Sequence, residues 1–109
     1  MQLYSIASGS SGNCIYVGGE EARILIDAGI SMKRIREGLM EENFLIENLH
    51  AIFITHEHTD HICGLGPVLR KYQIPVYATK ETIEAIWEKG DMKGVSEDLF
   101  HAVVPEKTV

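Results

Sequence analysis

The sequence is short of the features that mark several classes of protein. Its 109 residues contain two cysteines, Cys14 and Cys63, which are too few for a disulfide framework and predict reduced thiols. The longest apolar runs fall far short of the roughly 20 residues that cross a bilayer. The N-terminus "MQLYSIASGSSG" also lacks the basic and apolar regions of a secretory signal. We therefore expect a cytoplasmic protein without a membrane partner.

A basic excess is absent as well. Ten Lys and Arg residues against 16 Asp and Glu residues give a formal charge of -6. Such a chain does not attract nucleic acid over its whole surface. Bound divalent cations would change this locally, because they would be the largest charges in their site. The 45% hydrophobic and 24% charged residues are ordinary for one globular domain or part of one.

Three β-rich runs open the chain. They read "LYSIA", "CIYVG" and "ARILI", and are separated by the loop "SGSSGN" and by Gly18-Gly19. Turn residues between short β-rich runs predict an antiparallel meander. The third run ends at Asp27-Ala28-Gly29.

Helical and strand patterns alternate after Gly29. With Ser31 as N-cap, a helix is predicted whose inner face holds Met32, Ile35, Leu39 and Met40. The uninterrupted apolar run 51–54 predicts a strand covered on both faces. A helix follows from His61 or Pro67 to Tyr72, then a strand in "IPVYAT".

The last third continues the same alternation. Thr79 is the expected N-cap of a helix in "KETIEAIWEK", and Gly90 is its expected terminator. Ile83, Ile86 and Trp87 are predicted to point inward. A final strand is predicted in "LFHAVV". The whole order indicates an α/β fold, a mixed sheet with helices on one side and functional groups past the strand ends.

The segment "FITHEHTDHICGL" is the strongest chemical signal. It holds three of the five histidines and one carboxylate between His56 and His61. Along extended chain His56, His58 and Asp60 can project to one side, and His61 breaks the alternation. The simplest geometry gives His56 and His58 to one metal ion and Asp60 and His61 to a second nearby. Imidazole with carboxylate suits zinc, manganese or iron.

The alternative is that these histidines are ordinary solvated loop residues. From this composition a chance match to His-x-His-x-Asp-His is expected on the order of once in a few thousand sequences. Three protonated imidazoles so close together would also repel one another. The pattern therefore favours a metal site.

"THEHTDHICGL", together with "SIASGSSGNCIYVG" and "ARILIDAG", resembles the metallo-β-lactamase fold superfamily. The whole chain is similar to the N-terminal part of its YycJ-type (WalJ-type) metallohydrolases. The resemblance implies that His56, His58, Asp60 and His61 bind metal and that Asp60 orients or deprotonates the attacking water. It also implies that Asp27 is a carboxylate bracing the histidine loop; a turn-forming Asp is the alternative.

The remaining polar candidates are weaker. In relatives the loop with Ser10, Ser11 and Asn13 lies at the rim of the active-site groove, and a plain hairpin turn is the alternative. His50, His101 and Cys63 match no ligand position. Lys33, Arg34 and Arg36 are expected to form a solvated face, so the residues that bind substrate are unknown.

The resemblance implies ligands that this chain does not contain. A third histidine for the first metal, a bridging aspartate and a last histidine would all lie downstream. We therefore expect residues 1–109 to be a single partial domain, the N-terminal half of a four-layer αβ/βα sandwich of roughly 200–250 residues. Its uncovered sheet face would meet the missing C-terminal half or a second copy.

The implied function of the intact protein is hydrolysis of a phosphodiester in DNA, or in RNA, by water that two divalent metal ions activate. The 109-residue chain alone would then be inactive. One alternative is a metallohydrolase of thioester or lactam substrates. Another is a metal-binding module without catalytic activity.

Overall fold

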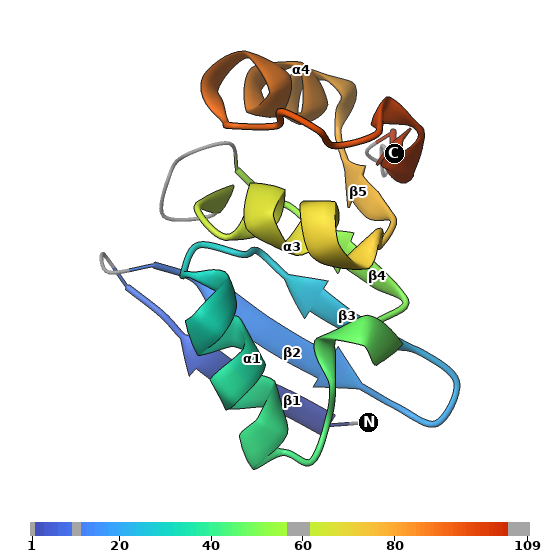
Figure 1. Cartoon of the computed structure of the whole chain (residues 1–109). Helices are drawn as coiled ribbons and strands as arrows, with labels where there is room; N and C mark the ends of the chain where they lie inside the picture. Colours follow the sequence, from blue (N-terminus) through green and yellow to red (C-terminus); the bar gives the residue numbers. More distant parts are fainter. Residues whose placement is uncertain (1, 10–11, 57–61, 105–109) are drawn as a thin grey trace.

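The computed structural model describes residues 2–9, 12–56 and 62–104. Within these ranges six strands form one mixed sheet whose spatial order follows the chain order (Figure 1). The strands are β1 (Gln2–Ala7), β2 (Cys14–Gly18), β3 (Arg23–Ile26), β4 (Ala51–Phe53), β5 (Val76–Ala78) and β6 (Phe100–Ala102). The helices are α1 (Met32–Glu41), α3 (Leu65–Tyr72) and α4 (Lys80–Lys89), with 3-10 turns η1 (Ile46–Asn48) and η2 (Glu97–Leu99).

The first three strands form the predicted antiparallel meander. β1 pairs with β2 from Gln2 opposite Gly18, and β2 pairs with β3 from Ile15 opposite Ile26. From β3 onward the pairing is parallel, and each return to the sheet runs through a helix. Because β3, β4, β5 and β6 run the same way, their carboxyl ends share one edge of the sheet.

The helix boundaries follow the predicted caps. The Ser31 side chain accepts a hydrogen bond from the backbone N–H of Arg34, and Thr79 does the same for Thr82. The backbone N–H of Gly90 bonds to the carbonyl of Ile86 where α4 ends. Helix α3 begins at Leu65, between the two predicted starts. None of the helices in the described ranges is long and apolar enough to span a membrane.

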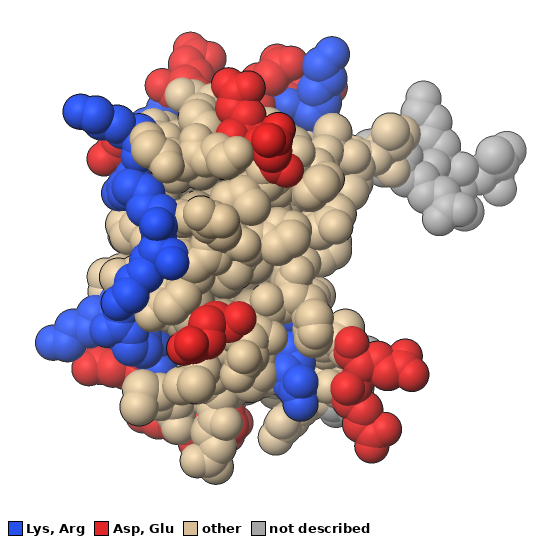
Figure 2. All heavy atoms as spheres, turned by 45° about the vertical axis from the view of Figure 1, so that its right-hand side comes forward, with Lys and Arg blue, Asp and Glu red and all other residues tan. Residues whose placement is uncertain are grey.

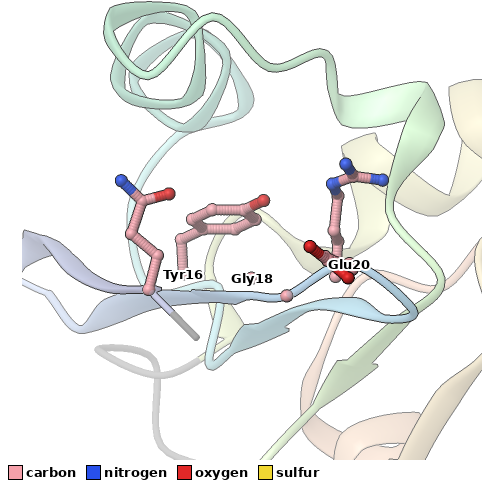
Figure 3. Close-up of a pocket in the computed structure, with 6 residues that line it drawn as sticks. Tyr16, Gly18 and Glu20 are labelled. Atoms are coloured by element: carbon pink, nitrogen blue, oxygen red, sulfur yellow. The ribbon is translucent and has the colours of Figure 1, made fainter.

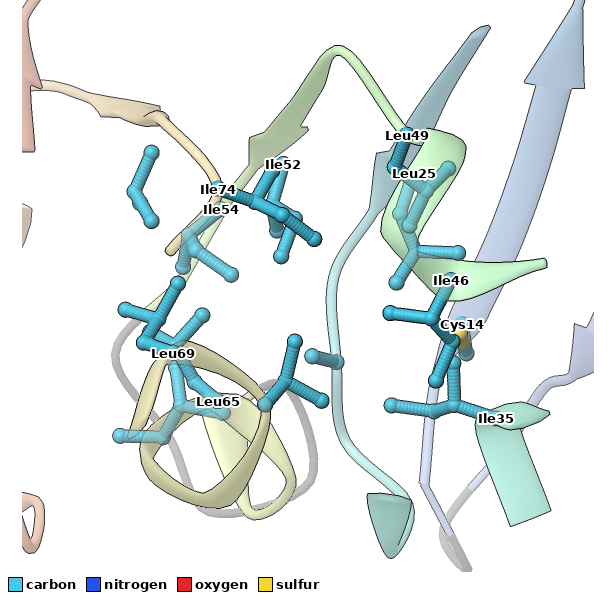
Figure 4. Packing of buried hydrophobic residues seen from close by; sticks show 14 of the residues in the cluster. Cys14, Leu25, Ile35, Ile46, Leu49, Ile52, Ile54, Leu65, Leu69 and Ile74 are labelled. Carbon is cyan, nitrogen blue, oxygen red and sulfur yellow. The ribbon is translucent and has the colours of Figure 1, made fainter. Parts of the chain in front are cut away.

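One face of the sheet packs against the helices and forms the core (Figure 4). The paired residues Leu25, Ile52 and Val76 lie side by side on this face and are fully buried. They meet Ile35 and Leu39 of α1, Leu65, Val68 and Leu69 of α3, and Ile86 of α4. Burying side chains of this size stabilises the fold by about 1.5–3 kcal/mol each, before the cost in chain entropy.

The opposite face corrects the expectation that strand 51–54 is covered on both sides. Phe53 is 38% exposed there, and Leu3 is 71% exposed. The Phe53 ring stacks on Tyr77, and Tyr77 stacks on His101, at centroid distances of 5.2 and 5.0 Å. Within the described residues this face carries a continuous row of paired side chains: Ile15, Ile26, Phe53, Tyr77 and His101.

One prediction for the helices is also corrected, and three are confirmed. Met40 is 55% exposed, because at about 100° per residue it lies about 140° around α1 from Ile35, off the face that buries Ile35 and Leu39. Ile83, Ile86 and Trp87 point inward as predicted: Ile86 is fully buried, and Ile83 and Trp87 are partly buried against the core. Trp87 lies nearer the edge of the sheet, where its ring packs edge-on against Phe100 of β6.

Candidate metal centre

The site lies past the carboxyl ends of β3 and β4. Asp27 follows β3 directly, and Thr55 and His56 follow β4 after one further residue. The backbone N–H of Asp27 donates to the carbonyl of Phe53 at 2.7 Å, which extends the parallel pairing by one bond. The register of two buried strands therefore brings these residues together although they are 28 positions apart.

Asp27 holds the turn after β4 through its side chain. Its Oδ1 accepts from the backbone N–H of Thr55 at 2.8 Å, and its Oδ2 accepts from the Thr55 hydroxyl at 2.7 Å. Asp27 is 5% exposed and has a φ of 64°, in the left-handed region. That backbone conformation costs about 1–3 kcal/mol. Hydrogen bonds to a charged group contribute about 1.5–3 kcal/mol each and offset it.

His56 is exposed at the beginning of the loop that carries the predicted ligands. Its Nδ1 lies 3.2 Å from the hydroxyl oxygen of Thr55. His58, Asp60 and His61 lie outside the described residues, so their assignment as metal ligands stays a prediction. Among the residues described, no group of three His, Cys, Asp or Glu side chains is close enough to hold a metal.

Of the four predicted ligands, His56 lies within the described residues, and its chemistry is compatible with a divalent metal ion. His56 offers an imidazole at a strand end, and its Nδ1 contact with Thr55 leaves coordination to Nε2 chemically compatible. The predicted donor set of imidazoles and a carboxylate suits zinc, and also manganese or iron. His56, His58, Asp60 and His61 are the residues that would hold such ions.

Residues 28–30 join the neighbouring loops to this edge. The N–H of Gly29 donates to the carbonyl of Asn13, and the N–H of Gly64 donates to the carbonyl of Ala28. A Cβ added at Gly64 would collide with the carbonyl oxygen of Ile30. The segment around Gly64, which follows the histidine loop, is therefore packed closely against the turn after β3.

The Asn13 side chain closes the turn between β1 and β2. It accepts from the N–H of Gly9 at 3.3 Å and donates to the carbonyl of Gly9 at 3.4 Å. Gly12 has a φ of 128° and lies against the carbonyl of Gly29. These contacts are those of a hairpin turn, and Ser10 and Ser11 lie outside the described residues.

Cys14 is buried beneath the same edge. Burial, followed by repulsion from the Asp27 carboxylate, raises the pKa of the Cys14 thiol from 9.0 to about 12. The thiol therefore keeps its proton at neutral pH in the metal-free chain. Between pH 9.0 and about 12 the unfolded chain loses this proton first, so stability falls as the pH rises.

The other histidines lie away from this turn. His50 lies before β4, at the other end of that strand, and its Nδ1 accepts from the backbone N–H of Arg23 at 2.9 Å. His101 is on β6 and stacks on Tyr77. Both side chains are exposed, so of the two interpretations, surface or core, the structure supports surface positions.

A hollow of about 390 Å³ lies at the opposite end of the sheet (Figure 3). Tyr16, Gly18, Glu20 and Arg23 line it with two other residues, around the hairpin between β2 and β3. The Arg23 guanidinium lies 5.3 Å from the centre of the Phe44 ring. This hollow is therefore separate from the site beside Asp27.

Sequence reasoning missed the contribution of Thr55. A threonine at a strand end is a common β residue and carries no motif of its own. Its contacts with Asp27 and His56 depend on the register between β3 and β4, which only the fold supplies.

The metallo-beta-lactamase superfamily profile matches residues 7–107, and the chain belongs to this superfamily. It is 46% identical over 81 residues to the exodeoxyribonuclease YycJ of Bacillus anthracis, covering 74% of this chain and 31% of that protein. It is 50% identical over 84 residues to the exodeoxyribonuclease WalJ of Streptococcus pneumoniae, covering 76% and 31%. The chain thus spans about a third of the length of these relatives.

A solved structure extends the likeness to nearly the whole chain. A B3 metallo-beta-lactamase with an active-site glutamic acid aligns with a TM-score of 0.76 at 17% identity, covering 98% of this chain and 44% of that one. At this identity the likeness concerns the fold alone. It confirms the predicted fold class, an α/β arrangement matching part of the metallo-β-lactamase sandwich.

Gly64→Ala tests the close packing of the chain that leaves the histidine loop. Because the added methyl group meets the Ile30 carbonyl, we expect a loss of about 1–3 kcal/mol in the free energy of unfolding, measured in urea. Gly19→Ala is the matched control, since the nearest atom to its added Cβ is 3.8 Å away. Equal stability of the two variants would contradict the packing described.

Thiol labelling tests the environment of Cys14. At neutral pH we expect an aromatic disulfide reagent to modify Cys63 rapidly, because it is exposed, and Cys14 only on unfolding. Cys63→Ser should remove the fast reaction, and Cys14→Ser should leave it unchanged. Fast labelling of Cys14 in the folded chain would show that the thiol is not buried as described.

Proposed function

We propose that this chain is the N-terminal, metal-binding half of a nuclease that hydrolyses phosphodiester bonds in DNA with a free end. The histidine motif directly after β4, next to the Asp27 brace, carries the proposal. The similarity to two exodeoxyribonucleases supports the choice of substrate. RNA is the nearest alternative substrate.

The residue roles follow from the motif and its position. His56 and His58 would bind a first divalent ion, and Asp60 and His61 a second. When bound, such ions supply the positive charge that activates water and stabilises the attacking and leaving oxygens. Asp60 would orient or deprotonate the water. Asp27 would not bind metal but would hold the start of the histidine loop in place, because both of its oxygens accept hydrogen bonds from Thr55.

Zinc and manganese suit this donor set best, with iron as a further candidate. We keep all three, because imidazole and carboxylate ligands accept each of them. A cytoplasmic location is part of the proposal and rests on the reduced cysteines predicted from the sequence.

The proposal requires ligands from outside residues 1–109, which would form a single partial domain. The uncovered sheet face supports this requirement. Its aromatic row of Phe53, Tyr77 and His101 would be covered by the C-terminal half of the sandwich, or by a second copy of the chain. Burial of such rings is favourable, whereas their exposure leaves a patch that promotes association.

The charge distribution is consistent with a local attraction for phosphate only. The formal charge is -6, and Figure 2 shows acidic and basic side chains interspersed around a largely uncharged centre. Basic side chains gather along the left edge of that view. Bound metal ions would add the largest local positive charges for attracting a DNA backbone.

Hydrolysis of a thioester or lactam by the same site is the second candidate, because the fold is shared with metallo-beta-lactamases. A metal-binding module without catalytic activity is the third. A substrate panel separates them: turnover of lactams or thioesters without cleavage of DNA or RNA would decide for the second. Metal binding by the intact protein without turnover of any of these substrates would favour the third.

His58→Ala and Asp60→Ala are expected to abolish DNA cleavage by the intact protein, because each removes a proposed metal ligand. Asp98→Ala is the matched control, since Asp98 is an exposed carboxylate in η2 and should leave the rate unchanged. The measurement is release of nucleotides from end-labelled DNA with manganese or zinc. Cleavage that survives either ligand substitution would refute the assignment.

The 109-residue chain by itself should show no DNA cleavage under the same conditions. The reason is that part of each coordination sphere would be missing. The assay compares the purified chain with the intact protein at equal concentration and includes Asp60→Ala to detect contaminating nuclease. Turnover that disappears in Asp60→Ala would show that the chain is sufficient for activity.

A further inference from the structure

Thr55 connects the buried Asp27 carboxylate to the His56 ring. Its backbone N–H and its hydroxyl both donate to Asp27, at 2.8 and 2.7 Å. The same hydroxyl oxygen lies 3.2 Å from Nδ1 of His56. One short side chain therefore contacts both a carboxylate and an imidazole nitrogen.

The single hydrogen of the Thr55 hydroxyl determines which atom donates in its contact with His56. A threonine hydroxyl has one hydrogen and can also accept hydrogen bonds through its oxygen. An ionised carboxylate only accepts, so the hydroxyl hydrogen points to Oδ2 of Asp27. The Thr55 oxygen can then bond to Nδ1 of His56 only if that nitrogen carries the hydrogen.

We infer that Thr55 is a positioning residue that fixes the neutral His56 ring in the tautomer protonated at Nδ1. Asp27 takes the Thr55 hydrogen, Thr55 accepts from Nδ1–H, and Nε2 keeps its lone pair. The role of this tautomer in metal binding rests on the proposed function. The tautomer itself does not, because it is a property of the metal-free chain.

Fixing this tautomer of His56 matters because a histidine side chain in water favours the opposite tautomer, with hydrogen on Nε2. A metal ion needs a lone pair on the nitrogen that it binds, and the hydrogen bond at the other nitrogen determines where that lone pair is. Thr55 is β-branched and fixed at two points on Asp27, so its oxygen has little freedom to move away from the ring. The site would thus be prepared before a metal ion arrives.

Nuclear magnetic resonance measures the tautomer directly. A long-range proton–nitrogen correlation of the 15N-labelled, metal-free chain reports which ring nitrogen of each histidine carries hydrogen. The spectrum is recorded about two pH units above the ordinary imidazole pKa of about 6.5, and His56→Gln assigns the His56 signals. We expect hydrogen on Nδ1 of His56.

Two substitutions at Thr55 separate the hydroxyl from the rest of the side chain. Thr55→Val removes the hydroxyl and should shift the His56 population toward hydrogen on Nε2. Thr55→Ser keeps the hydroxyl and should restore hydrogen on Nδ1. Thr79→Val controls for a general loss of stability, since it removes a hydroxyl that caps α4, and it should leave His56 unchanged.

Asp27→Asn is an independent test that keeps every heavy-atom position. Its amide oxygen would have to face the Thr55 N–H, which places the amide nitrogen, a donor, next to the Thr55 hydroxyl. The hydroxyl hydrogen would then turn toward His56 and meet a lone pair on Nδ1. We expect hydrogen on Nε2 of His56, although two hydrogen-bond contacts separate residue 27 from the ring. Asn also tolerates the positive φ of Asp27.

The outcomes are distinct. The inference is supported if the His56 hydrogen is on Nδ1 in the natural chain and in Thr55→Ser. It must also shift to Nε2 in Asp27→Asn and in Thr55→Val. Hydrogen on Nε2 in the natural chain overturns it, and so does an unchanged His56 in a folded Asp27→Asn. If Thr55→Val does not fold, Asp27→Asn decides alone.

Zinc titration of the intact protein then tests the link to the site. If His56 is a ligand, Thr55→Val should weaken zinc binding about 10–100-fold and Thr55→Ser should restore it. The expected tautomer pattern without any effect on zinc binding would leave the inference standing and count against the proposed metal site. A zinc effect without the tautomer pattern would overturn the inference and leave the proposed function in place.

Discussion

Two hydrogen bonds from Thr55 to the Asp27 carboxylate hold together the part of this chain that carries its chemistry. They join the ends of β3 and β4 where the ladder of the sheet stops, and they allow Asp27 to adopt a left-handed backbone. The histidine loop begins at the next residue, His56. His56 is therefore attached directly to Thr55, which makes two hydrogen bonds to a buried carboxylate.

Much of the fold could be predicted because local patterns and tertiary packing agree. The meander follows from turn residues between β-rich runs, and the caps at Ser31 and Thr79 follow from hydroxyl side chains before helical periods. The apolar run 51–54 does not reveal that Phe53 is exposed, since such a run fits cover on both faces; only the expectation of a partial domain allowed for an uncovered face. Met40 was misplaced because the helical period puts it about 140° around the helix from Ile35, outside the buried face.

The candidate site was only partly accessible from sequence. Its histidine motif is compact and visible, and Asp27 could be singled out from "ARILIDAG" through a family resemblance. The contacts of Thr55 were not visible, because they join residues 28 positions apart through the pairing of two strands. The burial of Cys14 beneath Asp27 likewise depends on the fold and not on any local pattern.

The central claim is that this edge of the sheet presents nitrogen and oxygen donors to shared divalent ions. Anomalous X-ray diffraction from crystals of the intact protein, grown with zinc or manganese, tests it most directly. The account predicts an anomalous peak about 2.0–2.3 Å from Nε2 of His56, close to the His58, Asp60 and His61 side chains. Imidazoles turned toward solvent, with no anomalous peak beside them at full metal saturation, would contradict it.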